Sequence, residues 1–134
     1  MKTHAVIDTN VIISALISTK SDSATVRILD KLFDEEIIPL YNQEILKEYR
    51  EVMNRPKFQI AQSDVELVIK SITESGIEID AVYSDVVLTD PKDQVFYDIF
   101  LSFPDSYLIT GNLKHFPTND HIVNPAGMIY IMTQ

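Results

Sequence analysis

Short apolar segments alternate with segments of helical periodicity along this 134-residue chain. Residues 4–7, 37–41 and 106–110 are apolar runs that predict buried strands, and "HIVNP" and "MIYIM" predict two short closing strands. Between the first three runs, apolar residues recur at the three- and four-residue spacing of a buried helix face. Because parallel strands need long crossover connections, this alternation predicts an α/β fold with a mostly parallel sheet and helices on both faces.

Capping residues and helix breakers indicate where the predicted helices begin and end. Ser23, Asn42 and Ser63 suit the N-cap position of three helices, and Gly76 suits the end of the third. Pro91 suits the first turn of the helix that precedes strand 106–110. We expect helices from about residue 10 and over 21–36, 42–55, 63–76 and 90–103, extended chain over 77–83 and 85–88, and a turn or short helix at 111–116.

The composition limits which kinds of partner and which cellular compartment we expect for this protein. The net charge of −9 and a pI near 4.6 argue against a protein that holds nucleic acid mainly through a basic surface. Either a partner is cationic, or the acids gather where a divalent metal ion neutralises them and meets an anionic substrate. We expect a single domain over residues 1–134. The sequence has no cysteine, no signal segment in "MKTHAVID" and no apolar run of about 20 residues. These features favour a cytoplasmic protein with no membrane contact.

Acidic and amide side chains fall where the predicted strands end. Asp8 follows the first strand, Thr110, Gly111 and Asn112 follow strand 106–110, and Asp93 begins the helix before it. Ligands of open α/β sheets bind outside the carboxyl ends of the strands, so a fold that also brings Glu48 to this edge forms a carboxylate pocket. Close carboxylates raise one another's pKa, and a hard divalent cation with oxygen ligands relieves that repulsion.

Each of these residues also has a structural interpretation. Asp8, Thr9 and Asn10 are all residue types that cap helices, and Glu48 alone would be a solvated helix acid. Asp90 and Asp93 flank a proline at a helix start, and we assign Asp90 as the cap and Asp93 as the metal-site acid. Asp98, about 140° further round the helix, is expected to lie on the surface or behind the site. The stretch 110–112 suits a tight turn as well as a site.

The basic and histidine residues give weaker signals. His4, His115 and His121 lack a spacing suited to zinc, and we expect each to be structural or exposed. The four cations at 47–57 lie on one helix and its exit, and either form a solvated face or contact a phosphate backbone. These four are Lys47, Arg50, Arg55 and Lys57. Lys114 is a further candidate because it is close to Asn112.

Four blocks in order give the chain a family resemblance. They are "AVIDTNVIISAL", "EILKEYREVMNRPKF", "DPKDQVFYDIF" and "YLITGNLKHF", which together span nearly the whole chain. In this order they resemble the signature blocks of PIN-domain nucleases, and most closely the toxin components of bacterial toxin–antitoxin systems, akin to VapC-type ribonucleases. The resemblance implies a three-layer PIN-like fold whose central sheet has four to five strands.

The resemblance also implies roles for individual residues. Asp8, Glu48 and Asp93 match the acids that hold Mg²⁺ or Mn²⁺, and Asn112 stands where many members carry a fourth aspartate. An amide oxygen still ligates a cation or positions water, but it forgoes an attraction of about 4 kcal/mol gross per charge pair at 4 Å. We therefore expect weaker metal affinity. Substrate positioning is expected from Thr9, Asn10, Thr110 and Lys114, and contact with the RNA backbone from Arg50, Arg55 and Lys57.

Three functional hypotheses follow. The first is a metal-dependent endoribonuclease in which Asp8, Glu48, Asp93 and Asn112 are catalytic, and which leaves a 5′ phosphate and a 3′ hydroxyl. The resemblance adds a cognate antitoxin protein that covers the acidic groove, and a homodimer. The second is a PIN fold weakened in catalysis by Asn112 that binds RNA or protein. The third, a phosphoacceptor receiver domain, is disfavoured because the strand 37–41 ends without an acid.

Overall fold

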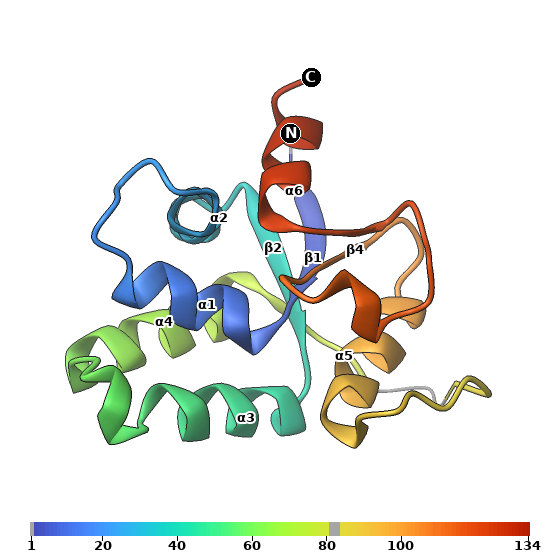
Figure 1. Ribbon diagram of the computed structural model, residues 1–134, viewed down its shortest axis with the longest axis horizontal. Coiled ribbons are helices and arrows are strands. Elements are labelled where there is room, and N and C mark those ends of the chain that lie inside the picture. The colour runs from blue at the N-terminus through green and yellow to red at the C-terminus, as the bar shows by residue number, and fades with distance from the viewer. Residues whose placement is uncertain (1, 81–83) are drawn as a thin grey trace.

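The computed structural model describes residues 2–80 and 84–134, in which strands and helices alternate (Figure 1). The strands are β1 (Thr3–Ile7), β2 (Ile37–Tyr41), β3 (Ile77–Glu78), β4 (Tyr107–Ile109) and β5 (Ile122–Val123). The helices are α1 (Thr9–Ile17), α2 (Ala24–Phe33), α3 (Gln43–Met53), α4 (Gln62–Ser75), α5 (Pro91–Leu101) and α6 (Pro125–Met132), with 3₁₀ turns at Pro56–Phe58 and Leu113–His115. No helix of the described part is long and apolar enough to cross a bilayer.

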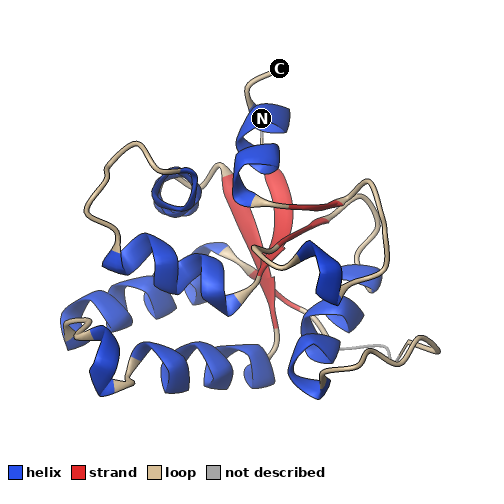
Figure 2. Ribbon diagram, in the orientation of Figure 1, coloured by secondary structure: helices blue, strands red, loops and turns tan. Residues whose placement is uncertain are grey.

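The five strands form one parallel sheet in the order β3-β2-β1-β4-β5. Helices cover both of its sides (Figure 2), with α1 and α2 on the left of the view and α5 on the right. The predicted three-layer α/β architecture with a parallel sheet of four to five strands is confirmed. The strand order runs outward from β1 in both directions, so the chain reverses its direction of travel across the sheet between β1 and β4. This reversal is where open α/β sheets place their ligands.

Buried apolar residues make β1 the centre of the molecule. Ala5, Val6 and Ile7 are at most 1% exposed, as expected for a strand covered on both faces. Helix α3 buries five apolar residues at the three- and four-residue spacing of a helix face: Ile45, Leu46, Tyr49, Val52 and Met53. The hydroxyl of Tyr49 donates a hydrogen bond to the carbonyl of Ile7, which ties α3 to the end of β1 one residue before Asp8.

The predicted caps are correct at two helices and wrong at a third. Ser23 accepts a hydrogen bond from the Val26 amide, and Asn42 accepts one from the Ile45 amide. Helix α4, however, begins at Gln62 with Ala61 at the N-cap, so Ser63 lies inside the helix instead of capping it. Gly76 ends this helix as predicted. The predicted extended stretch 77–83 forms β3 at its start, and its residues 81–83 lie outside the described residues.

The prediction of a strand at "MIYIM" is wrong, because these residues belong to α6. Short apolar runs do not distinguish a strand from a buried helix by periodicity. The local signals for a helix were present in the residues before the run. The Asn124 side chain accepts a hydrogen bond from the Gly127 amide at 2.7 Å, and Pro125 occupies the first turn, where its missing amide hydrogen costs nothing.

Gly76 allows α4 to end close against β2. A Cβ at this position would clash with the backbone carbonyl oxygens of Ile72 and Pro39, neither of which can move independently. We expect Gly76→Ala to lower the free energy of unfolding by about 2 kcal/mol or more, as overpacking does. Gly111→Ala is the matched control, since a Cβ there meets nothing within 4 Å. Urea denaturation of both variants checks the prediction, and equal stabilities would contradict it.

Candidate active site

The four residues predicted to be catalytic line one polar cleft of about 170 Å³ at the carboxyl edge of the sheet. Asp8 comes from the end of β1, Glu48 from the middle of α3, Asp93 from the first turn of α5, and Asn112 from the loop after β4. The cleft is lined by Asp8, Thr9, Asn10, Glu48, Val52, Arg55, Asp90, Lys92, Asp93, Phe96, Asn112 and His115. Side chains up to 107 residues apart in the sequence therefore share a single cavity.

Asp8 is the most buried acid of the cleft, at 6% exposure. It occupies the N-cap position of α1, but its side chain makes no capping hydrogen bond. Its carboxylate instead accepts a hydrogen bond of 2.8 Å from the Thr110 hydroxyl. Burial raises the pKa of Asp8, and the charges of Asp93 and Glu48 raise it further, against the lowering effects of Thr110 and of the Asn10 amide. The carboxylate thus lines the cleft while it also interacts with the amide of Asn10 in the first turn of α1.

Thr110 forms a turn and also contacts an acid of the cleft, so the two alternatives that the sequence left open are compatible. Its fully buried hydroxyl donates to Asp8 and accepts a hydrogen bond of 2.9 Å from the Asn112 amide. The second contact closes a turn of the kind that serine and threonine form two residues ahead. The turn brings Asn112 to the cleft.

Thr9 contacts a second acid of the cleft, Glu48. The Thr9 hydroxyl, 3% exposed, donates a hydrogen bond of 3.0 Å to Oε2 of Glu48. Glu48 is half-buried beside the inward-facing Tyr49, so the interpretation as a fully solvated helix acid is wrong. Asp8 is therefore one acid of the cleft, and its neighbour Thr9 donates a hydrogen bond to another, Glu48.

Asp93 is paired with His115, a residue that the sequence did not single out for the site. Nδ1 of His115 lies 3.1 Å from Oδ2 of Asp93. Burial raises the pKa of Asp93, while the charge of His115 and its hydrogen bond lower it. Asp90 caps α5 through the Lys92 amide, as predicted. The other two histidines are structural: His4 contacts the ring of Phe103, and His121 stacks on Tyr107.

Only some of the predicted cations reach the cleft. Arg55 lines it, together with Lys92, which the sequence did not indicate. Arg50 is engaged in an ion pair of 2.7 Å with Glu66 on α4, and the Lys57 ammonium lies over the ring of Phe58. Lys114, the further candidate near Asn112, lines a neighbouring cavity. Lys47 lies along a shallow groove that Glu48 and Lys92 also line.

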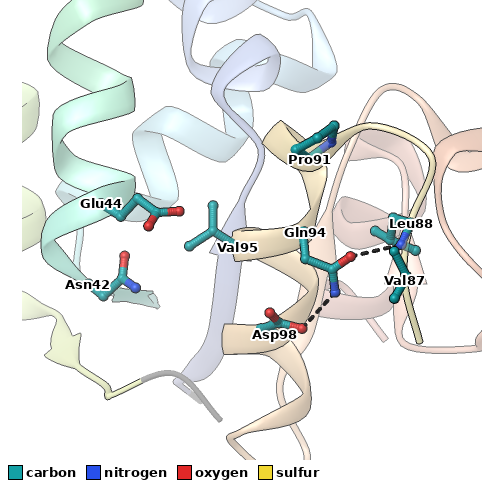
Figure 3. A pocket seen from close by; sticks show the side chains of 8 residues that line it. All are labelled: Asn42, Glu44, Val87, Leu88, Pro91, Gln94, Val95 and Asp98. Carbon is teal, nitrogen blue, oxygen red and sulfur yellow. Dashed lines mark hydrogen bonds between the residues drawn. The ribbon is translucent and has the colours of Figure 1, made fainter. Parts of the chain in front are cut away.

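Asp98 lies outside the acid cleft, and it is buried instead of lying on the surface. Figure 3 shows it below Gln94 on α5, in a separate cavity of about 310 Å³ that opens toward Asn42 and Glu44. The Asp98 carboxylate accepts hydrogen bonds from the Gln94 side chain and from the Ser84 amide, while Gln94 also accepts one from the Leu88 amide. Asp98 and Gln94 thus fasten the loop before α5 and position the helix that carries Asp93.

The chemistry of the donors in the cleft fits a hard divalent cation. Four carboxylates line the cleft, of which Asp8, Glu48 and Asp93 are the predicted ligands, and Asn112 adds an amide oxygen. Burial and like charge disfavour the ionised forms of Asp8 and Asp93, which a cation would stabilise. Within residues 2–80 and 84–134, however, no three acidic or histidine side chains are drawn together closely enough to form a ready-made metal site. The acids instead contact Thr110, Thr9 and His115.

A parallel α/β sheet with acids gathered at its switch point defines a protein with a polar ligand-binding cleft at that edge. A family model for the PIN domain matches residues 4–114, and the chain belongs to this family. PIN domains are generally nucleases and typically use divalent metal ions. No curated protein and no solved structure matches the sequence significantly.

The raised pKa values of Asp8 and Asp93 predict a pH dependence of stability. An acid whose pKa is raised on folding stabilises the native state fully only below its ordinary value of 3.8, and this contribution is lost as the pH rises through the raised value. We expect Asp8→Asn to make the metal-free protein more stable at pH 7, by roughly 4 °C in Tm for each kcal/mol gained.

Thermal unfolding of both proteins in a chelator between pH 4 and pH 8 measures this effect. The difference between Asp8→Asn and the wild type should shrink toward pH 4. Asp30→Asn, which removes an exposed acid of α2, controls for the change in net charge. A variant Asp8→Asn that is less stable than the wild type at pH 7 would contradict the prediction.

Proposed function

We propose that the chain is a metal-dependent endoribonuclease that hydrolyses RNA phosphodiester bonds. The observation that carries this proposal is the meeting of Asp8, Glu48 and Asp93 in one cleft of a PIN-family fold. These three residues would hold Mg²⁺ or Mn²⁺, with Asn112 as a weaker, uncharged ligand or a residue that positions water. No protein nucleophile is required, in keeping with a chain that has no cysteine.

The bound cation would supply positive charge that makes an attacking water more acidic and neutralises the leaving 3′ oxygen. Residues of the chain position the carboxylates that would bind this cation. Thr110 and Thr9 hold the Asp8 and Glu48 carboxylates by hydrogen bonds, so fewer rotamers are lost when a ligand binds. Burial is the main cause of the raised pKa of Asp8, and the charges of Asp93 and Glu48 add to it; a bound cation would offset both effects.

The cations of the cleft give the substrate's phosphate a place to bind. Arg55 and Lys92 stand at the rim of an acid-lined cavity, where their charges offset the repulsion between RNA and the carboxylates. We therefore assign backbone contact to Arg55 and Lys92. Arg50 and Lys57 contribute less, since Glu66 and the Phe58 ring already engage them.

A second function, binding without cleavage, is favoured by two observations. An amide stands at position 112 in place of an acid, and the described side chains form no ready-made metal site. A PIN fold with these properties would bind RNA or protein in the same cleft. The two functions differ in their response to metal, because binding to the native state alone stabilises a protein by mass action.

We expect purified protein to cleave single-stranded RNA in millimolar Mn²⁺ and to be inactive in a chelator. Asp8→Asn and Asp93→Asn should each lower kcat/KM by more than the roughly 10- to 100-fold that loss of an outer partner of a metal ligand costs. Gel analysis of end-labelled RNA measures cleavage, and end-group analysis should find a 5′ phosphate and a 3′ hydroxyl.

Two further measurements test the same proposal. Asp105→Asn, at an exposed turn after α5, is the control variant and should cleave like the wild type. Asn112→Asp should tighten Mn²⁺ binding about tenfold, equivalent to about 1.4 kcal/mol, as judged by thermal shift. Metal-dependent cleavage that survives both Asp8→Asn and Asp93→Asn would refute the nuclease, and neither cleavage nor stabilisation by Mn²⁺ would favour the binding module.

We further propose that this nuclease is the toxin of a toxin–antitoxin pair, as its resemblance in sequence implies. A cognate antitoxin would cover the acid cleft with a cationic segment, which suits the net charge of −9. A homodimer in the cytoplasm remains part of this proposal. Induced expression in a bacterial host should arrest growth with the wild type but not with Asp8→Asn. Equal growth with both proteins, at equal expression, would contradict the toxin role.

A further inference from the structure

The carboxyl edge of the sheet continues past the acid cleft to a second cavity of about 320 Å³. Strand β5 lies parallel to β4, so Asn124, which follows β5, stands beside the loop that follows β4. The cavity is lined by Gly111, Asn112, Leu113, Lys114, His115 and Asn124. It shares Asn112 and His115 with the acid cleft, so the two cavities adjoin.

The chemistry of this second cavity is unlike that of the cleft. Four acids line the cleft, whereas the second cavity has no acid in its lining and carries Lys114 instead. Leu113 is 44% exposed there, an apolar contact surface that packing of the core does not use. The second cavity can therefore accept an anionic and partly apolar ligand, such as a nucleotide. The acid cleft would repel the same ligand unless its carboxylates hold a cation.

The polar groups of the cavity are positioned and available. Asn124 directs its side-chain oxygen to the Gly127 amide at 2.7 Å, which fixes the carboxamide, and in the described part of the chain its amide nitrogen donates to no other residue. No hydrogen bond within residues 2–80 and 84–134 engages the carboxamide of Asn112 either. His115 is half-exposed, and its contact with Asp93 holds the ring at the border between the two cavities.

We propose that this cavity is a nucleotide-binding subsite, which holds one nucleotide of a single-stranded RNA next to the bond that is cleaved. Asparagine carboxamides pair with base edges, and an exposed ring offers a stacking surface for a base. A base enters such a cavity only when it is unstacked, as in single strands, loops and bulges. The volume is near the lower limit for small-ligand pockets and suits a single nucleotide. The inference rests on the proposed nuclease function.

Gly111 allows a direct steric test. A Cβ at Gly111 meets nothing within 4 Å, and its backbone is not in the left-handed region, so a large side chain can be introduced without strain. We expect Gly111→Trp to fill the subsite and lower kcat/KM for single-stranded RNA at least tenfold. The midpoint of Mn²⁺ stabilisation should stay within twofold of the wild type, because Gly111 is not part of the acid cleft. Leu67→Trp, at a half-exposed position on α4, is the matched control.

Asn124→Ser tests base reading without blocking the cavity. Serine retains the oxygen that caps α6 but removes the amide nitrogen. Sequencing of fragment ends from random-sequence RNA should show a changed base preference at the nucleotide beside the cleaved bond, with an unchanged Tm. This variant decides the question if Gly111→Trp fails to fold.

Nucleoside 5′-monophosphates provide a readout without cleavage or metal. In a chelator, titration with AMP, CMP, GMP and UMP should shift the amide resonances of Gly111, Lys114 and the Asn124 side chain. A wild-type rate for folded Gly111→Trp, or an unchanged base preference for Asn124→Ser, would overturn the subsite even if the wild type cleaves RNA. A wild type that cleaves no RNA in Mn²⁺ would instead overturn the proposed function, and the subsite with it.

Discussion

A hydrogen bond from the hydroxyl of Thr110 to the carboxylate of Asp8 joins the ends of β4 and β1, where the path of the chain across the sheet reverses. Both residues are almost completely buried, so the bond lies in an environment of low dielectric, where its loss would leave a charge uncompensated. The same hydroxyl accepts the amide of Asn112, and this contact sets the direction of the loop after β4. The positions of the cleft and of the adjoining cavity both depend on this arrangement.

Gathering ionised carboxylates in the acid cleft lowers the free energy of unfolding at neutral pH. Burial and like charge raise the pKa of Asp8 and Asp93, which means that the fold holds these groups against their preference for water. The core supplies the compensation, because β1 is wholly buried and Tyr49 connects α3 to its last carbonyl. Conflicts of this kind between a local preference and the global fold are expected at functional sites.

Features of this fold that depend on a few neighbouring residues can be predicted from the sequence, whereas those that depend on distant residues cannot. Apolar periodicity and capping residues predicted five of the helices, and the first strands, because these signals act within a few residues of the chain. The last helix is an apolar run with no polar face, so its periodicity does not distinguish it from a strand, and its helix signal lies in the preceding cap at Asn124. The acids were predicted from their places at strand ends and from the family resemblance, whereas His115 and Lys92 carried no local signal.

The sequence by itself determined the class of fold, the number of apolar strands at the centre and the residue types that gather at their carboxyl ends. These follow from periodicity, from the need to bury apolar surface and from the chemistry of carboxylates. Only the tertiary structure decided which partners the side chains take: Thr9 for Glu48, His115 for Asp93, Glu66 for Arg50, and Asn124 as a neighbour of Asn112. Such pairings depend on the order of strands in the sheet and the placement of helices on it, which arise from long-range packing that no short segment of the chain encodes.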